Sequence, residues 1–152
     1  MKISVYSIEK SENENIKCLN GEFIKMISRF AKTEEITLFN ASIAQAQSKN
    51  ADEAKKSYMT AYEPYLKGYT VALDETGEEM TSLEFSKIFD TQNDIRFFIG
   101  GAYGFEKQFL ARTQRVISLS RLTYAHKIAK LVLFEQIYRG LCIKNNHPYH
   151  KE

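Results

Sequence analysis

The sequence predicts an α/β protein in which a mostly parallel sheet is flanked by helices. Short apolar runs that suit strands alternate along the chain with segments whose apolar residues recur at helical spacing. The connections between these runs are long enough to hold helices, as parallel strands require. The chain has 152 residues, of which 43% are hydrophobic, so it can bury one core and we expect a single domain over residues 1–152.

Five segments have the pattern of strands. Residues 2–8 alternate between polar and apolar, and the run YTVALD at 69–74 is short, apolar and β-branched. The run IRFFI at 95–99 ends at a glycine pair. The remaining two predicted strands span residues 36–41 and 116–119.

Helical spacing fills the segments between the predicted strands. We expect helices over residues 16–30, 51–65 and 106–114, and a last helix from 124 or 125 to about 140. Thr81 and Glu84 have the spacing of a capping box, which predicts a further helix at that point. Residues 43–50 are rich in Gln, Ser and Lys with little periodicity, and they predict a mobile loop.

Targeting signals and a metal framework are not indicated by the sequence. No run approaches the roughly 18–20 apolar residues that span a bilayer, and the first ten residues do not form the apolar core of a signal peptide. We therefore expect a cytoplasmic protein with no membrane partner. Cys18 and Cys142 lie far apart, without the spacing of a zinc site, which predicts reduced thiols and no bound metal.

Charge is strongly polarised along the chain, although the net charge is only +2. Residues 1–106 carry 12 Lys and Arg against 17 Asp and Glu, whereas residues 107–152 carry 9 against 2. A basic segment with interleaved tyrosines and histidines can attract a phosphate backbone, and it can equally be a solvated face. Charge by itself leaves both interpretations open.

Three loops follow predicted strands: residues 73–77, 100–104 and 118–123. In an open parallel sheet such loops gather at one edge and bind ligands there. The glycines of the second loop allow either close approach to a ligand or an ordinary tight turn. The hydroxyls of the third loop suit either a polar pocket or a helix cap. Neither the G-x-G-x-x-G pattern nor the Walker phosphate loop occurs, so support for nucleotide hydrolysis is missing.

Four ordered blocks are more specific than these general patterns: FFIGGAYGF, SLSRLTYAH, LFEQIYRGLCI and the ending HPYHKE. In their order and spacing they resemble the ribosomal large subunit pseudouridine methyltransferase H family, and VALDETG extends the match to residue 71. The family belongs to the SPOUT class. The resemblance implies a parallel sheet with a C-terminal trefoil knot and a homodimer with active sites at the subunit interface.

The resemblance also implies S-adenosyl-L-methionine as the cofactor. Carried over by motif position, the residues expected to contact it are Leu73, Gly101, Ser120, Arg121, Leu122, Thr123, Tyr124 and Ala125. Leucine can cover an adenine face, and glycine lets the backbone come close to a ligand. The implied reaction is methylation of N3 of a pseudouridine in 23S ribosomal RNA, within the assembled ribosome.

Three residues are candidates for the chemistry by the same resemblance. Arg139 can hold a uracil oxygen or a phosphate, Tyr149 can stack on the base, and His150 can accept a proton near neutral pH. Which of them removes the N3 proton stays open. We expect His126 to be structural and His147 to face solvent. The predicted phosphate contacts are Lys130, Arg112, Arg115, Arg121 and Lys144.

Two motifs depart from the family pattern. Ala102-Tyr103 stands where the family commonly has Pro-Glu, and Tyr124-Ala125-His126 stands where it commonly has Leu-Pro-His. These departures motivate one alternative, an RNA-binding module with the same fold and without turnover. The strand pattern alone favours another, a nucleotide-binding protein of flavodoxin-like topology, which would bind phosphate or flavin and have no knot.

Overall fold

The computed structural model describes residues 1–11 and 13–151, and these form one five-stranded parallel sheet in the order β2-β1-β4-β3-β5. The strands are β1 (Lys2–Ile8), β2 (Lys32–Leu38), β3 (Tyr69–Glu79), β4 (Asp94–Ile99) and β5 (Arg115–Ser118). The predicted parallel sheet is therefore confirmed. The flavodoxin-like alternative is wrong, because that topology places its strands in the order 2-1-3-4-5.

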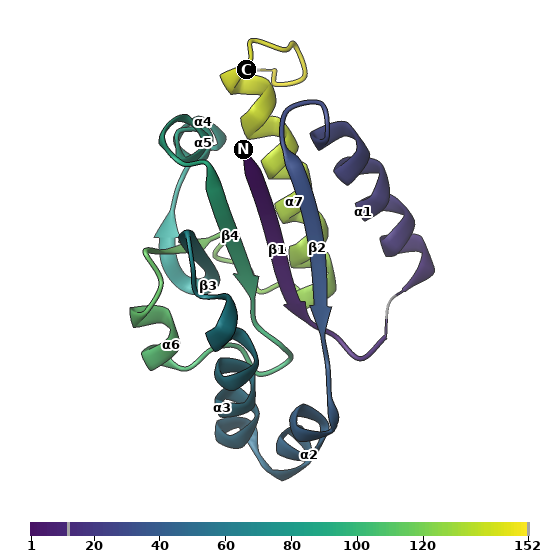
Figure 1. Ribbon diagram of the computed structural model, residues 1–152, viewed down its shortest axis with the longest axis vertical. Helices are drawn as coiled ribbons and strands as arrows, with labels where there is room; N and C mark the ends of the chain where they lie inside the picture. The colour runs from purple at the N-terminus through teal and green to yellow at the C-terminus, as the bar shows by residue number, and fades with distance from the viewer. Residues whose placement is uncertain (12, 152) are drawn as a thin grey trace.

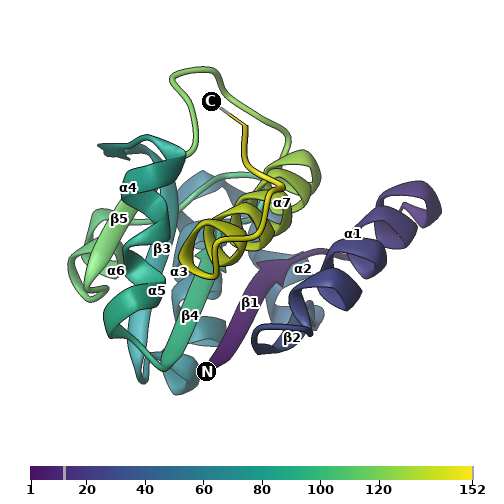
Figure 2. The same cartoon turned by 90° about the horizontal axis from the view of Figure 1, so that it is seen from above.

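Helices cover both faces of the sheet (Figures 1 and 2). They are α1 (Glu14–Ile27), α2 (Ala41–Lys49), α3 (Ala51–Tyr62), the 3-10 turn η1 (Glu63–Tyr65), α4 (Ser82–Ser86), α5 (Ile88–Thr91), α6 (Lys107–Ala111) and α7 (His126–Lys144). Helices α1, α4, α5 and α7 pack on one face, and α2, α3 and α6 pack on the other.

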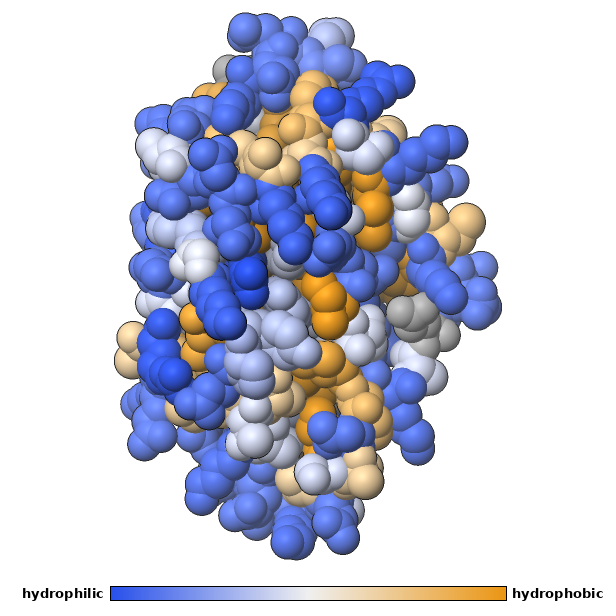
Figure 3. Space-filling view, in the orientation of Figure 1, coloured by the Kyte–Doolittle hydropathy of each residue, from blue (hydrophilic) through white to orange (hydrophobic). Residues whose placement is uncertain are grey.

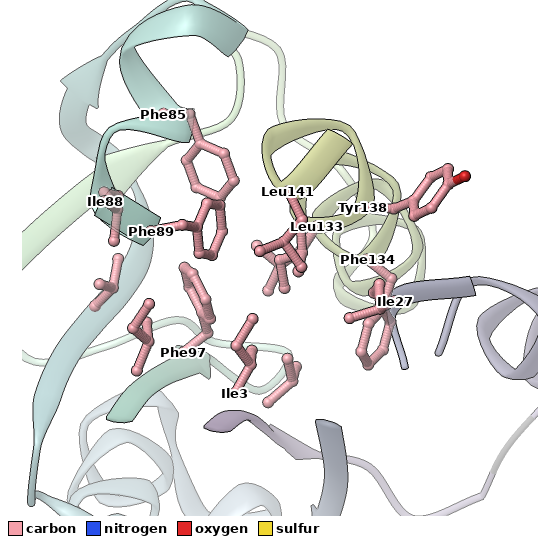
Figure 4. Close-up of a cluster of buried hydrophobic side chains, with 14 of the residues drawn as sticks. Ile3, Ile27, Phe85, Ile88, Phe89, Phe97, Leu133, Phe134, Tyr138 and Leu141 are labelled. Carbon is pink, nitrogen blue, oxygen red and sulfur yellow. The ribbon is translucent and has the colours of Figure 1, made fainter. Parts of the chain in front are cut away.

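The two faces have separate cores because successive strand residues point in opposite directions. Phe97 belongs to the core under α7, whereas its neighbour Phe98 belongs to the core under α3. Figure 4 shows the first core, in which Phe85 and Phe89 face Leu133 of α7 above the sheet. Full burial of one such side chain stabilises the fold by about 1.5–3 kcal/mol.

Two sequence predictions need correction. Residues 43–50 are not a mobile loop, because α2 covers nearly all of them and Asn40 caps its start by accepting from the Ile43 amide at 2.8 Å. The second strand begins at Lys32, four residues before its predicted start. Its polar beginning was missed because β2 lies at the edge of the sheet, where polar residues stay partly exposed. The capping box of Thr81 and Glu84 is confirmed.

The outer surface in the view of Figure 1 is largely hydrophilic, and hydrophobic residues show mainly down its middle, with smaller spots towards the edges (Figure 3). Among the described residues, no helix is both long and apolar enough to cross a membrane. Cys18 is exposed and Cys142 is buried, and both are free thiols.

A buried ion cluster joins three elements of the fold. Lys130 of α7 is 2% exposed, and its ammonium lies 3.0 Å from the Glu9 carboxylate and 2.7 Å from that of Glu35. It also lies 3.1 Å from the hydroxyl of Ser7. The prediction that Lys130 contacts RNA phosphate is wrong, because this ammonium is enclosed between the ends of β1, β2 and α7. The Lys130 ammonium instead neutralises the carboxylates of Glu9 and Glu35 inside the protein.

Replacing Lys130 by methionine should destabilise the protein by about 3–5 kcal/mol, since two carboxylates lose a buried cation. Urea denaturation followed by circular dichroism measures this change. Lys107→Met is the matched control, because Lys107 is exposed on α6 and the same chemical change there should shift stability by less than about 0.5 kcal/mol. Equal effects of the two substitutions would contradict a structural role for the cluster.

Candidate functional site

A cavity of about 440 Å³ lies where a bulge within β3 and the loops after β4 and β5 converge with the start of α7, so the predicted loop at residues 73–77 is part of a strand. This convergence is what the parallel topology predicts. The size is within the range of small-molecule sites. The lining comprises Leu73, Asp74, Glu75, Ile99, Gly100, Gly101, Ala102, Tyr103, Gly104, Ser118, Leu119, Ser120, Leu122, Thr123, Tyr124, Ala125, His126 and Ala129.

One wall of the pocket is a bulge within β3. Both Leu73 and Glu78 pair with Ile117 of β5, so the four residues between them loop out of the ladder. Gly77 allows the chain to rejoin β5 at Glu78, because a Cβ at position 77 would lie only 2.7 Å from the backbone of Ile117. The bulge presents Asp74 and neighbouring polar groups to the cavity.

The loop after β5 is tied to this bulge and to itself. The Thr123 hydroxyl donates to the Glu75 carboxylate at 2.9 Å. The Leu122 amide donates to the Ser120 hydroxyl at 2.9 Å, and the Ser118 hydroxyl donates to the Ser120 carbonyl at 2.8 Å. These bonds shape a loop that has no regular secondary structure.

Seven of the eight residues expected to contact the cofactor line this cavity, namely Leu73, Gly101, Ser120, Leu122, Thr123, Tyr124 and Ala125. Arg121 is not part of the lining. Its side chain is 86% exposed, and its Nε lies 3.8 Å from the Glu79 carboxylate on the outside of the loop. The assignment of all eight to a cofactor stays a prediction.

His126 begins α7 at the edge of the cavity. Burial lowers the pKa of its imidazole, and the carboxylate of Glu9 offsets part of this effect. Ala125 precedes it with φ −55°, an angle that proline also adopts. The alanine found here in place of the family's proline therefore fits the same backbone.

A second cluster lies at the far end of α7, where the C-terminal tail folds back on the helix. Glu135 accepts from Nε and Nη2 of Arg139 at 3.0 and 2.5 Å, and from the Tyr149 hydroxyl at 3.0 Å. The Arg139 guanidinium lies 4.8 Å from the centre of the Tyr149 ring. Its Nη1 lies 3.2 Å from Nδ1 of His150. The three predicted catalytic residues are thus brought together.

Electrostatics fix the protonation within this cluster. The hydrogen bond to Glu135 raises the pKa of Arg139 above its ordinary value, so the guanidinium is cationic and only donates. A hydrogen bond from Arg139 to Nδ1 of His150 requires the tautomer that carries its ring hydrogen on Nε2. Burial, and next the hydrogen bond to Glu135, raises the pKa of Tyr149. Its phenol stays protonated at neutral pH.

The pocket and this cluster are well separated within one chain. Ala129 borders the cavity, and Arg139 lies ten residues further along the same helix, about 15 Å at the rise of an α-helix. In Figure 1 the arrowheads of β1, β2 and β4 point towards one end of the molecule, and α7 runs to the C-terminus at the other. One chain does not place the two groups at a common site.

Comparison with known proteins identifies the family. Residues 1–150 match the family described as "Predicted SPOUT methyltransferase". The chain belongs to this family. Two relatives named Ribosomal RNA large subunit methyltransferase H are 50% identical (Campylobacter lari) and 52% identical (Campylobacter concisus) over 151 residues, covering 99% of this chain and 100% of each relative. The resemblance stated from the motifs is therefore confirmed.

Two solved structures have a similar fold. A probable methylase family protein from Haemophilus influenzae has a TM-score of 0.61 at 15% identity, covering 99% of this chain and 70% of that one. A tRNA (m1G37) methyltransferase from Aquifex aeolicus has a TM-score of 0.56 at 13% identity, covering 91% and 70%. At such identities the likeness concerns the fold alone.

Several basic residues of the C-terminal segment have partners within this SPOUT chain. Arg112, Arg115 and Arg121 pair with glutamates of the first 106 residues. The Lys144 ammonium donates to the Phe89 carbonyl at 2.5 Å. All four are expected phosphate contacts, and that role stays a prediction.

His147 does not face solvent as the sequence suggested. Its Nδ1 is buried, and its ring meets the rings of Phe30 and Tyr138 edge to face, with centroids 6.4 Å apart in both pairs. The sequence prediction failed because it considered only the neighbouring proline. The histidine instead packs the beginning of the tail against α7 and against the turn that follows α1.

Three acidic residues shape the two sites and are not among the site residues predicted from the sequence. Asp74 and Glu75 line the pocket from the bulge, and their signal was present in the run LDETG. Glu135 organises the tail cluster. It lies four residues before Arg139 on a predicted helix, a spacing that favours an ion pair.

Removal of Glu135 should release the C-terminal tail. In Glu135→Ala the Tyr149 hydroxyl and the Arg139 guanidinium lose their common acceptor, so residues 147–151 should exchange amide hydrogens at least about tenfold faster. Hydrogen exchange followed by mass spectrometry measures this rate. Glu106→Ala on the opposite side of the fold is the control, and unchanged exchange in the tail of Glu135→Ala would contradict the proposed anchor.

Proposed function

We propose that this protein transfers a methyl group from S-adenosyl-L-methionine to N3 of a pseudouridine in 23S ribosomal RNA. One observation carries the proposal. A chain that matches relatives named for large-subunit ribosomal RNA methylation along their whole length has a cavity built from the three loops that its motifs single out. Because the proposed substrate lies within assembled ribosomes, we also propose that the protein acts in the cytoplasm.

The residues of the cavity fit this cofactor. Leu73, Ile99 and Leu119 offer apolar surface to an adenine, and the hydroxyls and backbone groups around Ser120 offer hydrogen bonds to its edges and ribose. Asp74 and Glu75 supply negative charge for a cationic ligand. When bound, S-adenosylmethionine supplies an electrophilic methyl group activated by its sulfonium.

The cluster of Glu135, Arg139, Tyr149 and His150 at the end of α7 suits the binding of the base that accepts the methyl group. N3 of the base must lose its proton, and the negative charge that develops spreads onto the adjacent oxygens. The cationic Arg139 and the Nε2–H of His150 can donate hydrogen bonds to such an oxygen. Tyr149 already packs against Arg139 and can stack on an unpaired base. In this arrangement His150 stabilises charge, and the N3 proton passes to water.

A homodimer can bring the pocket of one copy next to the cluster at the end of α7 of the other, although the two are far apart within one chain. In the proposed dimer the tail of one copy completes the pocket of the other, which one chain cannot do across about 15 Å of helix. Large apolar residues around the pocket are exposed, as an interface requires: Tyr103 45%, Leu122 72%, Tyr124 37% and Ile128 40%. A C-terminal trefoil knot is part of the same proposal.

The Arg139→Ala variant should lose about 10²-fold or more of its methyl transfer rate, because a charge-stabilising donor is removed. Labelled S-adenosylmethionine and ribosomes from cells lacking the gene provide the assay, with mass spectrometry to locate the methyl group. Lys107→Ala, which removes an exposed cation of α6 that is not among the expected phosphate contacts, is the control. Wild-type protein that binds ribosomes but transfers no methyl group would instead support the RNA-binding module without turnover.

Mixed dimers test the shared site directly. Arg139→Ala removes the cluster, and Ala125→Trp fills the pocket with a large ring, so each variant alone should be inactive. A dimer of one copy of each should recover about half of the wild-type activity, because one of its two sites is intact. Differently tagged copies, co-expressed and purified through both tags, give the sample. No recovery would contradict a site shared between subunits.

A further inference from the structure

Tyr58 of α3 lies directly beneath the glycine-rich loop of the pocket, although it is not part of the pocket lining. Its side chain is 0% exposed. A Cβ built on Gly101 would lie 2.4 Å from Cζ and 2.6 Å from the hydroxyl oxygen of Tyr58. The loop therefore rests on this phenol ring so closely that only glycine fits at the point of contact.

The hydroxyl of Tyr58 has a partner on the neighbouring helix. It donates to Oε1 of Gln47 on α2 at 2.5 Å. A buried hydroxyl is unfavourable without a partner, and this one orients the ring on which the loop rests. The backbone of Tyr103 and Ala102 lies close enough to lower the pKa of the same phenol.

The loop has little support of its own beyond one turn, which the Gly104 amide closes by donating to the Gly101 carbonyl at 3.1 Å. Gly100, Gly101 and Gly104 lie within five residues, and Gly104 has φ +77°. Glycine loses more conformational entropy on ordering than any other residue. A loop held in one shape before a ligand arrives binds more tightly, because that cost is not incurred during binding.

We propose that Tyr58, oriented by Gln47, is a positioning residue that holds residues 100–104 in the shape that receives the cofactor. The proposal rests on the proposed function, since it concerns the affinity of the same pocket for S-adenosylmethionine. It assigns a role in cofactor binding to the α2–α3 pair, which lies on the face of the sheet opposite α7.

The neighbouring Tyr62 provides a comparison within the same helix. It too is 0% exposed, and its hydroxyl donates to the Ile99 carbonyl at 2.5 Å. Ile99 is the last residue of β4 and pairs with Leu73 of β3, so the sheet already fixes its position. Ala102 and Tyr103 lie beyond the end of the strand and have no such ladder.

Burial raises the pKa of the Tyr58 phenol, which the amides of Tyr103 and Ala102 partly oppose. The hydroxyl is therefore protonated at neutral pH. It can then donate to Gln47, the bond that holds the ring in place beneath the loop.

The test compares Tyr58→Phe with Tyr62→Phe by calorimetry with S-adenosylmethionine and by unfolding in urea. Both variants lose one buried hydroxyl and should lose similar stability. Tyr58→Phe alone should weaken cofactor binding by about tenfold, because the ring beneath Gly101 loses the hydrogen bond to Gln47 that orients it. In the methyl transfer assay its KM for the cofactor should rise while kcat at saturation stays near that of the wild type.

Gln47 variants keep the proposal testable if Tyr58→Phe does not fold. Gln47 is only partly buried. Gln47→Ala removes the acceptor and should weaken cofactor binding in the same direction, whereas Gln47→Glu keeps an acceptor oxygen and should retain the affinity.

The outcomes separate this inference from the proposed function. If the wild-type protein does not bind S-adenosylmethionine, the proposed function fails. If the wild type binds and Tyr58→Phe binds equally well, the positioning role of Tyr58 is wrong. An equal loss of affinity in Tyr62→Phe would also overturn it, because the effect would then reflect general weakening of α3.

Discussion

The enclosure of Lys130 between two carboxylates is the constraint on which the arrangement of this protein depends. The chain leaves the sheet at the edge strand β5. Helix α7 must then start across the sheet from β5, so that Lys130 lies beside Ser7 of β1 and Glu35 of β2. A buried ammonium tolerates few positions, since each displacement separates it from Glu9 or Glu35 in an environment with little water. The ion cluster therefore sets both the position of α7 and its rotation about its own axis.

Helix α7, held in this position, has one group of functional residues at each end. Its first turns border the cavity, and its last turns carry the cluster around Glu135. Neither end can adjust alone, because the core under α7 packs Leu133, Phe134 and Ile137 against the sheet in between. A rigid spacer of this kind suits a protein whose pocket and tail meet only across two copies.

Much of the fold could be predicted from local patterns, and the failures have physical causes. Strands β1, β3 and β4 are apolar and buried, so periodicity located them. The edge strand β2 and helix α2 were misjudged because partial exposure leaves their sequences polar. The Lys130 cluster could not be foreseen, since residues about 120 positions apart contribute to it. For the site, ordered motifs predicted the lining of the pocket, whereas Tyr58 carries no motif and acts through tertiary contact.

The pairs that Arg112, Arg115 and Arg121 form with glutamates change the meaning of the basic C-terminal segment. An arginine that exchanges a carboxylate for a phosphate gives up one ionic contact as it gains another, and the freed carboxylate attracts cations that offset part of those released from the nucleic acid. Any contact of these arginines with the phosphates of RNA would thus be an exchange of partners. The glutamates of the first 106 residues would compete with phosphate for the same guanidinium groups.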